Sequence, residues 1–324
     1  MGGTTAVAAV RGGDPDSAGR AAVRRLADLG GLRVSDDWRG AAIVLDDVGA
    51  GELVVVAGPE VGARLQVPRD EERLLDLLLG AVTARAVRVG VVGAHGGAGA
   101  TTFAVALSRV PVRAGTPTVL VDLDPAGGVV ELLTGLERDP GTRWADLRRQ
   151  EGTLLPDRLT TSLPAFEHVR LLGGDLRGGA DVDEPVVTRA VRAVAQATDV
   201  MVLDLPRTVL ARSDDGRHPL VEELDHLLLV AGAGLRGGGA AAAVARSLAA
   251  TPGGPEVSLV VRRRAGEDVL ATDVAEACGL PLRTVVKHVR SLEAGVEHGV
   301  VPGTRRGPLR SAAEEAAGAL GIAS

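Results

Sequence analysis

The residues best suited to carry chemistry lie in a glycine-rich segment that follows an apolar run. The stretch VRVGVVGAHGGAGATTFAVALSR (87–109) predicts a strand, a loop and then a helix that opens at Thr101. The loop contains Gly96, Gly97 and Gly99. Glycines let a backbone approach a diphosphate, and N–H groups at a helix N-terminus hydrogen-bond phosphate oxygens. Because the Thr101 hydroxyl is also a suitable ligand for a phosphate-bound Mg²⁺, the segment predicts a nucleotide site.

One charge that such a loop usually carries is absent. In P-loops a lysine on the β- and γ-phosphates precedes the Mg²⁺-binding hydroxyl, and here that residue is Ala100. The chain strongly prefers arginine, since Lys287 is its sole lysine, but that preference would put arginine rather than alanine at this position. A cation opposite the transferred phosphoryl group stabilises the transition state. We therefore expect weak or absent ATP hydrolysis, with less effect on binding.

Two more segments place carboxylates at the ends of apolar strands. TVLVDLDPAGG (118–128) ends its strand at Asp122 and Asp124. DVMVLDLPR (199–207) is an apolar run that ends at Asp204. A carboxylate in such a position can hold a water of a phosphate-bound Mg²⁺. Each aspartate taken alone could instead cap a helix or form a turn.

Together the three motifs resemble those of the MinD/ParA family of deviant Walker ATPases, whose loop reads K-G-G-x-G-K-T-T. The resemblance implies ATP or ADP with Mg²⁺ as cofactor and a nucleotide-dependent homodimer. It assigns nucleotide binding to His95, Gly96, Gly97, Ala98, Gly99, Ala100, Thr101, Thr102 and Asp122. It also implies that Thr101 and Asp204 hold the metal and that Asp124 orients the attacking water. Both family lysines are replaced, by His95 and Ala100.

Two further segments are similar to the CpaE-like branch of that family. GTRWADLRRQEGTLLPDRLTTSLPAFEHVRLLGG (141–174) looks like its G-x-R-W-x-D-L segment, and CGLPLRTVVKHVRSLEAGVEHGVVPG (278–303) looks like its closing strand and helix. That branch also has alanine at the position of Ala100 and carries a degenerate receiver-like domain in front, which suits residues 1–82. Within the branch, the actinobacterial group that includes the septum site-determining protein Ssd is the nearest match.

The resemblance implies a regulatory protein that acts through its location in the cell. Its expected role is septum-site selection in cell division through nucleotide-dependent localisation, with partners in the division machinery. The alternative role is positioning or assembly of a Tad/Flp pilus or secretion apparatus, with partners there. A second alternative is a non-enzymatic scaffold that keeps only the fold and no longer binds nucleotide.

The remaining pattern predicts an α/β chain of two domains. Residues 86–324 are expected to form a mostly parallel, doubly wound sheet of the P-loop NTPase (SIMIBI, MinD-like) type, and residues 1–85 a smaller receiver-like α/β domain. In the first domain we expect strands at 6–10, 42–45, 53–57 and 64–67, and helices at 17–29 and 70–82. In the second we expect strands at 87–92, 118–122, 169–172, 200–203, 226–230, 257–261 and 283–287, and a small-residue helix at 234–248.

The front domain does not have the residues of a working receiver. A phospho-acceptor belongs at the end of the third strand, where Asp46 follows AIVL. The acidic pair that should follow the first strand is reduced to Asp14 and Asp16, several residues late, and no lysine precedes Pro68. We therefore interpret Asp46 as a turn residue rather than a phosphorylation site.

Composition excludes several other classes of protein. The chain has 324 residues, a net charge of −6 and one cysteine, Cys278, which excludes disulfide frameworks and thiolate metal sites. The acidic balance argues against nucleic-acid binding, and Arg262–Arg264 are interpreted as a solvated loop; the alternatives are a basic surface for nucleic acid and stacking on adenine.

No apolar run is long enough to span a membrane and the N-terminus has no leader pattern, so we expect a cytoplasmic protein, peripheral at the septum or pole. The C-terminal segment, 308–324, suits a short helix without the basic and aromatic residues of a membrane anchor.

A dinucleotide-dependent oxidoreductase is the rival enzyme class. Asp122 follows Gly99 at about the spacing of a ribose contact, roughly 20 residues. The glycine spacing is not G-x-G-x-x-G, however, and the chain contains no tyrosine to act as an acid. The motif that ends at Asp204 would also have no role. The resemblance to the MinD/ParA family implies that the first lysine of the loop reaches across the dimer to the other subunit. His95 stands at that position and is interpreted as a loop residue, although a protonated imidazole could replace the lysine.

Overall fold

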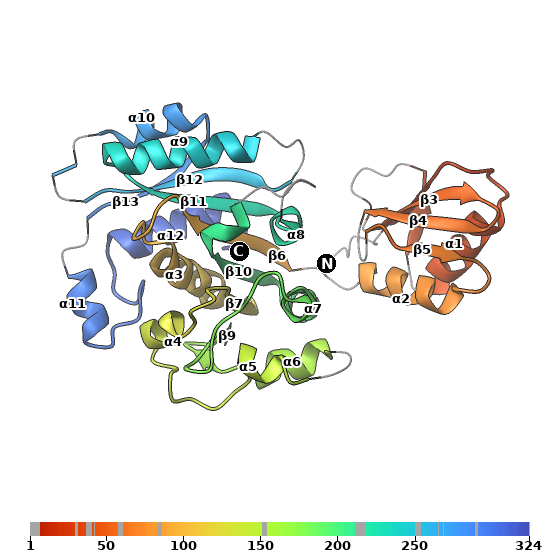
Figure 1. The fold of residues 1–324 in the computed structure, drawn as a ribbon, viewed down its shortest axis with the longest axis horizontal. Coiled ribbons are helices and arrows are strands. Elements are labelled where there is room, and N and C mark those ends of the chain that lie inside the picture. The colour runs from red at the N-terminus through yellow and green to blue at the C-terminus, as the bar shows by residue number, and fades with distance from the viewer. Residues whose placement is uncertain are drawn as a thin grey trace. The chain divides into compact units, whose positions relative to one another are not determined.

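The computed structural model describes residues 7–29, 32–36, 41, 43–57, 61–82, 86–150, 154–210, 218–249, 254–264, 266–267, 269–288 and 291–323. The chain divides into two compact units, Met1–Arg85 and Ala86–Ser324 (Figure 1). The described residues form one buried apolar cluster in the smaller unit and two in the larger unit.

The smaller unit is a five-stranded sheet with two helices in the part that is described. Its elements are β1 (Val7–Arg11), α1 (Ala18–Leu29), β2 (Arg33–Ser35), β3 (Ile43–Gly49), β4 (Glu52–Ala57), β5 (Arg64–Gln66) and α2 (Glu71–Val82). The strand order is β2-β1-β3-β4-β5. β1 is parallel to β2 and β3, whereas β4 is antiparallel to both of its neighbours. Helix α1 buries Ala22, Val23, Leu26 and Ala27 on one face, the spacing of an amphipathic helix.

The interpretation of Asp46 as a turn residue was wrong. Strand β3 continues through Gly49, so Asp46 and Asp47 both lie within it. Asp46 pairs with Arg11 on the neighbouring strand at 2.9 Å. Asp47 is buried, accepts a hydrogen bond from the Ser17 hydroxyl and accepts another from the Gly49 N–H at 3.0 Å. Contacts with distant segments of the chain thus give both carboxylates polar partners inside the strand.

In the described part of the chain the larger unit holds an eight-stranded sheet. Its strands are β6 (Val87–Gly93), β7 (Thr118–Asp122), β8 (Ala165–Phe166), β9 (Val169–Leu172), β10 (Val200–Leu205), β11 (His226–Gly232), β12 (Glu256–Arg262) and β13 (Leu282–Val286). The order is β13-β12-β11-β6-β10-β7-β9-β8, and every pair is parallel except β8 with β9. The mostly parallel doubly wound sheet predicted from the sequence is confirmed.

Helices cover both faces of this sheet, as its nearly continuous apolar strands require. They are α3 (Ala100–Arg113), α4 (Val129–Thr134), α5 (Trp144–Leu147), α6 (Pro156–Ser162), α7 (Pro185–Gln196), α8 (Pro219–Glu222), α9 (Leu235–Ala249), α10 (Ala271–Cys278), α11 (Leu292–Glu297) and α12 (Pro308–Ala319), with a 3₁₀ turn η1 (Arg207–Leu210). One apolar cluster joins the sheet to α5 through α10, and the other joins it to α3, α4 and α12. Figure 1 shows α9 and α10 on one side of the sheet and α3 and α12 on the other.

The C-terminal segment is part of the core. Helix α12 buries Leu309, Ala312, Ala313, Ala316 and Ala317 in the same cluster as α3. Its small residues let the two helices approach closely. Within the described ranges, none of the helices has both the length and the apolar character that a membrane crossing needs.

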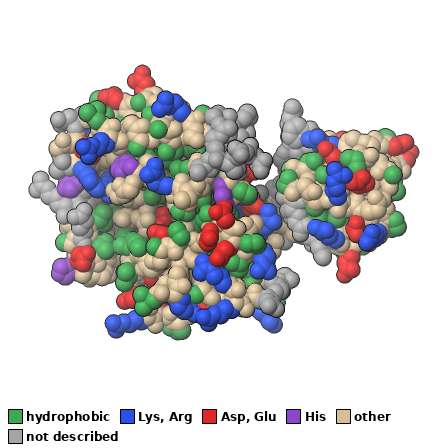
Figure 2. Space-filling view, viewed as in Figure 1, with side chains coloured by type: hydrophobic (Ala, Val, Ile, Leu, Met, Phe, Trp, Pro, Cys, Tyr) green, Lys and Arg blue, Asp and Glu red, His purple; other side chains and the backbone are tan. Residues whose placement is uncertain are grey.

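Charged side chains of both signs are mixed on the face of the larger unit that Figure 2 shows. Ion pairs at the surface of this unit include Arg177 with Asp146 and Arg148 with Glu184, at 2.6 and 2.7 Å. These exposed pairs contribute little to stability.

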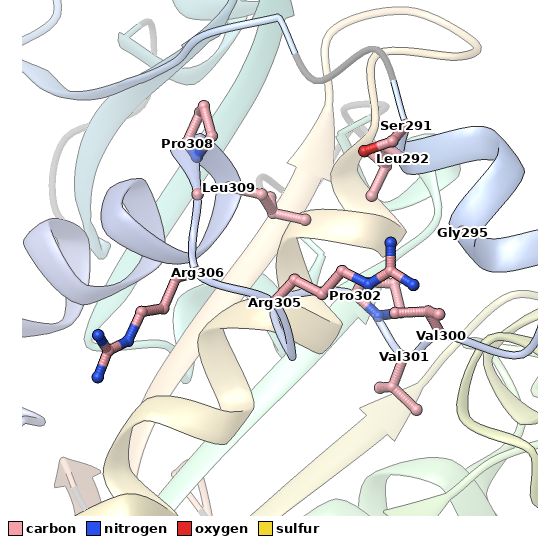
Figure 3. Close-up of a pocket in the computed structure, with 12 residues that line it drawn as sticks. Ser291, Leu292, Gly295, Val300, Val301, Pro302, Arg305, Arg306, Pro308 and Leu309 are labelled. Carbon is pink, nitrogen blue, oxygen red and sulfur yellow. The ribbon is translucent and has the colours of Figure 1, made fainter.

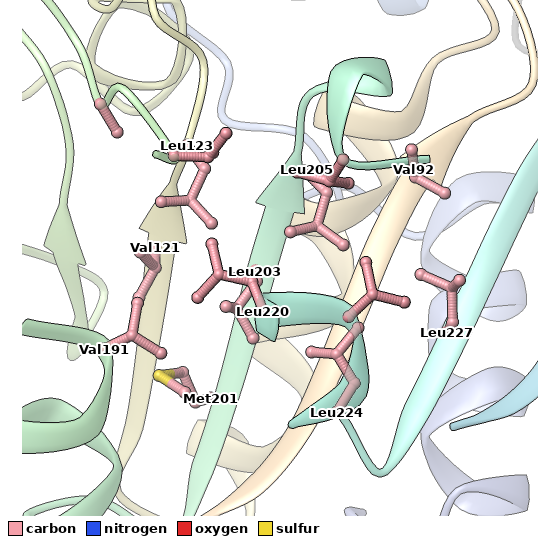
Figure 4. Packing of buried hydrophobic residues seen from close by; sticks show 14 of the residues in the cluster. Val92, Val121, Leu123, Val191, Met201, Leu203, Leu205, Leu220, Leu224 and Leu227 are labelled. Carbon is pink, nitrogen blue, oxygen red and sulfur yellow. The ribbon is translucent and has the colours of Figure 1, made fainter. Parts of the chain in front are cut away.

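Gly90 sets how closely the chain packs onto the centre of the sheet. It lies in the middle of β6, paired with Leu203 and Leu227 on the two neighbouring strands. A Cβ at this position would lie 2.5 Å from Cδ1 of Leu224 and 2.7 Å from Cδ1 of Leu205. Figure 4 shows these leucines gathered on one face of β6, β10 and β11. The absence of a side chain at Gly90 therefore makes room for them.

We predict that Gly90→Ala lowers the free energy of unfolding by about 1–3 kcal/mol, because the added methyl overpacks a buried cluster. Gly239→Ala is the matched control: this glycine is exposed on α9 and an added Cβ meets no atom within 4 Å. It should raise the free energy of unfolding by up to about 1 kcal/mol, the gain in helix propensity. Urea titration measures both, and a Gly90→Ala protein as stable as the wild type would contradict the packing argument.

Candidate functional site

A cavity of about 490 Å³ opens at the carboxyl ends of β6 and β10. Parallel sheets bind ligands at this edge. Every residue that the sequence assigned to the loop lines the cavity, together with Asp124 and Asp204. Asp122 does not line it and is buried instead. The lining is completed by Gly93, Pro125, Leu205, Pro206 and Arg207.

The loop presents backbone donors that nothing in the chain uses. Gly97 and Gly99 have φ angles of 71° and 95°, a left-handed conformation that favours glycine, and Gly99 is the N-cap of α3. Among the residues described, the N–H groups of Gly97, Gly99 and Ala100 have no hydrogen-bond acceptor, whereas Ala98 donates to the His95 carbonyl at 3.2 Å. Free N–H groups at the start of a long helix form a site for an anion such as a phosphate.

His95 is held inside its own chain through both ring nitrogens. Nε2 accepts a hydrogen bond from the Gly232 N–H at 3.2 Å. Nδ1 lies 2.9 Å from the carbonyl oxygen of Gly96, so the partners assign the proton to Nδ1. An imidazole fixed in this way joins the loop to the end of β11. The geometry favours the interpretation of His95 as a loop residue over that of a cation reaching another subunit.

Strand register brings the acidic residues together. Asp204 on β10 is paired with Asp122 on β7 and with Val91 on β6. The Thr101 hydroxyl, in the first turn of α3, lies close enough to the Asp204 carboxyl to lower its pKa. Asp122 accepts a hydrogen bond from the Asp124 N–H at 3.0 Å through Oδ1, while its buried Oδ2 has no partner in the part of the chain that is described. The hydroxyl and carboxylate assigned to Mg²⁺ therefore line the same cavity, near an unsatisfied carboxylate oxygen.

Burial changes the protonation of these carboxyls. Burial, together with the nearby charges of Asp122 and Asp124, raises the pKa of Asp204 to about 8, and the Thr101 hydroxyl partly opposes this rise. Burial also raises the pKa of Asp122 to about 7. A cation beside them would favour their ionised forms. In the described residues no three His, Cys, Asp or Glu side chains form a metal-binding group, so Mg²⁺ would depend on phosphate and water ligands as well.

Glycines fix the loop that carries Asp124. A Cβ on Gly179 would lie 1.9 Å from the carbonyl oxygen of Asp124, and one on Gly174 would lie 2.7 Å from Cα of Gly127. The Gly179 N–H donates to the carbonyl of Pro125 at 3.1 Å. The two loops, 124–128 and 173–179, therefore pack backbone against backbone, which only glycine permits.

The segment that resembles G-x-R-W-x-D-L contributes buried residues that hold the two loops in place. The indole N–H of buried Trp144 donates to the carbonyl of Asp122 at 2.7 Å. The backbone N–H of Trp144 donates to the Gly173 carbonyl at 3.1 Å. Buried Arg143 lies 3.5 Å from Glu131 on α4, and burial raises the pKa of that carboxyl to about 7. Trp144 thus anchors both the β7 acidic motif and the glycine loop that packs on it.

Three arginines lie near the loop and are not among the site residues predicted from the sequence. Arg207, which directly follows the Asp204-Leu-Pro motif, lines the cavity. Arg264 donates from Nη2 to the Gly97 carbonyl at 3.3 Å, and a Cβ on Gly99 would lie 2.7 Å from Nη1 of Arg262. The interpretation of 262–264 as a solvated loop was wrong for Arg262, which ends β12 and is half-buried beside Gly99. Arg263 and Arg264 follow the strand and are exposed, as expected, although Arg264 also reaches the glycine loop.

A second cavity, of about 190 Å³, lies between α11 and the start of α12 (Figure 3). Arg305 and Arg306 border it beside apolar side chains such as Leu292 and Leu309. No carboxylate is among the described residues that line it. It therefore lacks the combination of donors and acids that the first cavity has.

The chain matches no protein-family model. It is similar in sequence to the uncharacterized protein Rv3660c of Mycobacterium tuberculosis strain H37Rv: the two are 34% identical over 285 residues, which cover 86% of this chain and 78% of that protein. The uncharacterized protein MT3760 of Mycobacterium tuberculosis strain CDC 1551 matches to the same extent.

Solved structures with the same fold include several P-loop ATPases. The MinC:MinD cell division protein complex of Aquifex aeolicus matches with a TM-score of 0.57 and 17% identity, over 72% of this chain and 96% of that one. A ParA family ATPase of Chlorobium tepidum has a TM-score of 0.55 at 13% identity, over 72% and 97%. The cell division ATPase MinD of Pyrococcus furiosus has a TM-score of 0.53 at 18% identity, over 74% and 100%. The fold is that of the MinD and ParA ATPases.

The raised pKa of Asp204 predicts a pH dependence of stability. In the unfolded chain this carboxyl ionises near its ordinary value of 3.8, whereas in the folded chain it keeps its proton up to about pH 8. The folded state therefore binds more protons between these values, so the free energy of unfolding falls as the pH rises from about 4 to about 8. Urea titrations in EDTA should show a smaller fall for Asp204→Asn than for the wild type. Equal falls would contradict the protonated, buried state of Asp204.

Proposed function

This chain belongs to the same family as the Mycobacterium tuberculosis protein Rv3660c, and we propose that it is a regulatory protein that binds ATP or ADP with Mg²⁺ at the end of β6. The observation that carries the proposal is the set of unused N–H groups at the start of α3, facing a cavity of about 490 Å³. Donors of this kind match phosphate oxygens. The MinD/ParA fold of the larger unit supports the same choice of ligand.

The polar groups around the cavity suit a nucleotide with its metal. Thr101 and Asp204 line the same cavity, and they would hold Mg²⁺ between them and the phosphates. When bound, Mg²⁺ neutralises phosphate charge. The buried Asp122 carboxyl, with one oxygen unsatisfied, is paired with Asp204 on the neighbouring strand, and a metal there would favour its ionised form. The loop N–H groups would hold the phosphates without any side chain.

Hydrolysis is proposed to be weak or absent. Ala100 leaves no cation where the P-loop lysine would lie, and the ring nitrogens of His95 are bound within the chain. Asp124 lines the cavity and would orient the attacking water, but positioning a water without stabilising the developing charge gives little rate. A protein of this kind would respond to which nucleotide it holds rather than turn over rapidly.

The proposed cellular role is placement of the division septum, through a nucleotide-dependent homodimer that binds the division machinery at the septum or pole. The sequence resemblance supports it, as does the likeness in fold to cell division proteins. The same resemblance supports positioning of a Tad/Flp pilus or secretion apparatus as the alternative. The smaller unit is proposed to be a degenerate receiver-like domain, with its strand order β2-β1-β3-β4-β5 in support.

A scaffold that no longer binds nucleotide is the second candidate. The replaced lysines and the close approach of Arg262 to Gly99 favour it. In such a protein the loop would keep its shape through contacts with its own chain, and partners would recognise the fold alone.

Calorimetric titration with ADP and ATP in Mg²⁺ separates the two candidates. We expect micromolar binding by the wild type and at least about tenfold weaker binding by Gly99→Val. Valine at a φ of 95° is strained, and its Cβ would lie 2.7 Å from Arg262 Nη1. Gly239→Ala should bind as the wild type does. A wild-type protein that binds neither nucleotide at millimolar concentration would be the scaffold. Fluorescent fusions of the same variants would test whether septal or polar position depends on binding.

A further inference from the structure

We propose that Arg207 binds the nucleotide phosphates and supplies the positive charge that the lysine-free loop lacks. The inference rests on the proposed function and adds a residue to that site. Arg207 follows Pro206 at the end of the Asp204 strand, on a different segment from the glycine loop. The ligand class is a nucleoside diphosphate or triphosphate, recognised through its phosphates.

The balance of charge in the cavity calls for such a residue. Its lining contains the carboxyls of Asp124 and Asp204, and a diphosphate brings further negative charge. Of the described lining residues, Arg207 alone carries a permanently charged basic side chain, because the only other basic residue is His95. The helix N-terminus offers about half of one positive charge. A guanidinium would add a full charge and donors that fit two phosphate oxygens at once.

The position of Arg207 is fixed while its side chain is available. The residue opens the 3₁₀ turn η1, which buried Val209 anchors to the core. On the other side, Asp204 is held by strand pairing with β6 and β7. Arg207 is exposed, and among the described residues its side chain has no hydrogen bond or ion pair, although two carboxyls line the same cavity. A cation that is near acids and pairs with neither can bind an incoming anion without breaking an existing contact.

Arg262 and Arg264, the other two arginines near the glycine loop, do not share this position in the cavity. Arg264 donates to the Gly97 carbonyl, and Arg262 packs on Gly99, but neither lines the cavity. Their contacts are with the backbone of the loop itself. They brace the shape of the loop, whereas Arg207 faces the space that the phosphates would fill.

The test is the affinity for ADP and for inorganic pyrophosphate, each with Mg²⁺, measured by calorimetry. Arg207→Ala should weaken both by about tenfold or more, the loss expected when a charged hydrogen-bond partner is removed. Pyrophosphate has no base or ribose, so an equal loss for both ligands assigns the contact to the phosphates. Arg246→Ala, at an exposed arginine on α9 that does not line the cavity, should bind both ligands as the wild type does.

A second variant separates charge from structure. Adding Ala100→Lys to Arg207→Ala returns a cation to the cavity from the glycine loop, and it should recover most of the lost affinity. If the wild type binds ADP but Arg207→Ala binds it equally well, the role of Arg207 is wrong and the proposed function stands. If Ala100→Lys recovers nothing, Arg207 acts through structure rather than charge, and the inference fails. If the wild type binds neither ligand, the proposed function and this inference fail together.

Discussion

The parallel pairing of β10 with β6 and β7 is the constraint on which the site depends. Its register sets Asp204 level with Asp122 on one side and with Val91, just before the loop, on the other. Since parallel strands end at a common edge, the loop, both acidic motifs and Arg207 meet at one cavity. Buried side chains such as Leu203 and Leu205 hold that register, because a slip by one residue would move them to the opposite face of the sheet, where a different apolar cluster fills the space.

A second set of contacts holds this edge of the sheet in place. Trp144 is bonded to the Asp122 carbonyl, and the backbones at Gly127 and Gly179 are in contact, so the acidic motif of β7 cannot move independently of the 173–179 loop. On the other side, His95 ties the glycine loop to Gly232. Residues without chemistry of their own thus explain why the loop keeps its shape although the lysines are gone.

Most of the larger unit could be predicted from the sequence because its strands are long apolar runs, each followed by a turn signal. The short strands β2 and β8 have three and two residues and leave no such pattern. The strand through Asp46 was predicted to end too early, because its partners, Arg11 and Ser17, are distant in the sequence. The loop and aspartates of the site follow motifs, whereas Arg207 and Arg264 meet the loop only through tertiary packing.

The central claim is that the loop still binds phosphates through its backbone. Amide hydrogen exchange of residues 96–102, followed by mass spectrometry with and without saturating ADP and Mg²⁺, tests it most directly. Bound phosphates would engage the unused N–H groups of Gly97, Gly99 and Ala100, so their exchange should slow while that of the C-terminal half of α9 stays unchanged. Exchange in the loop that is unaffected by ADP would contradict the claim.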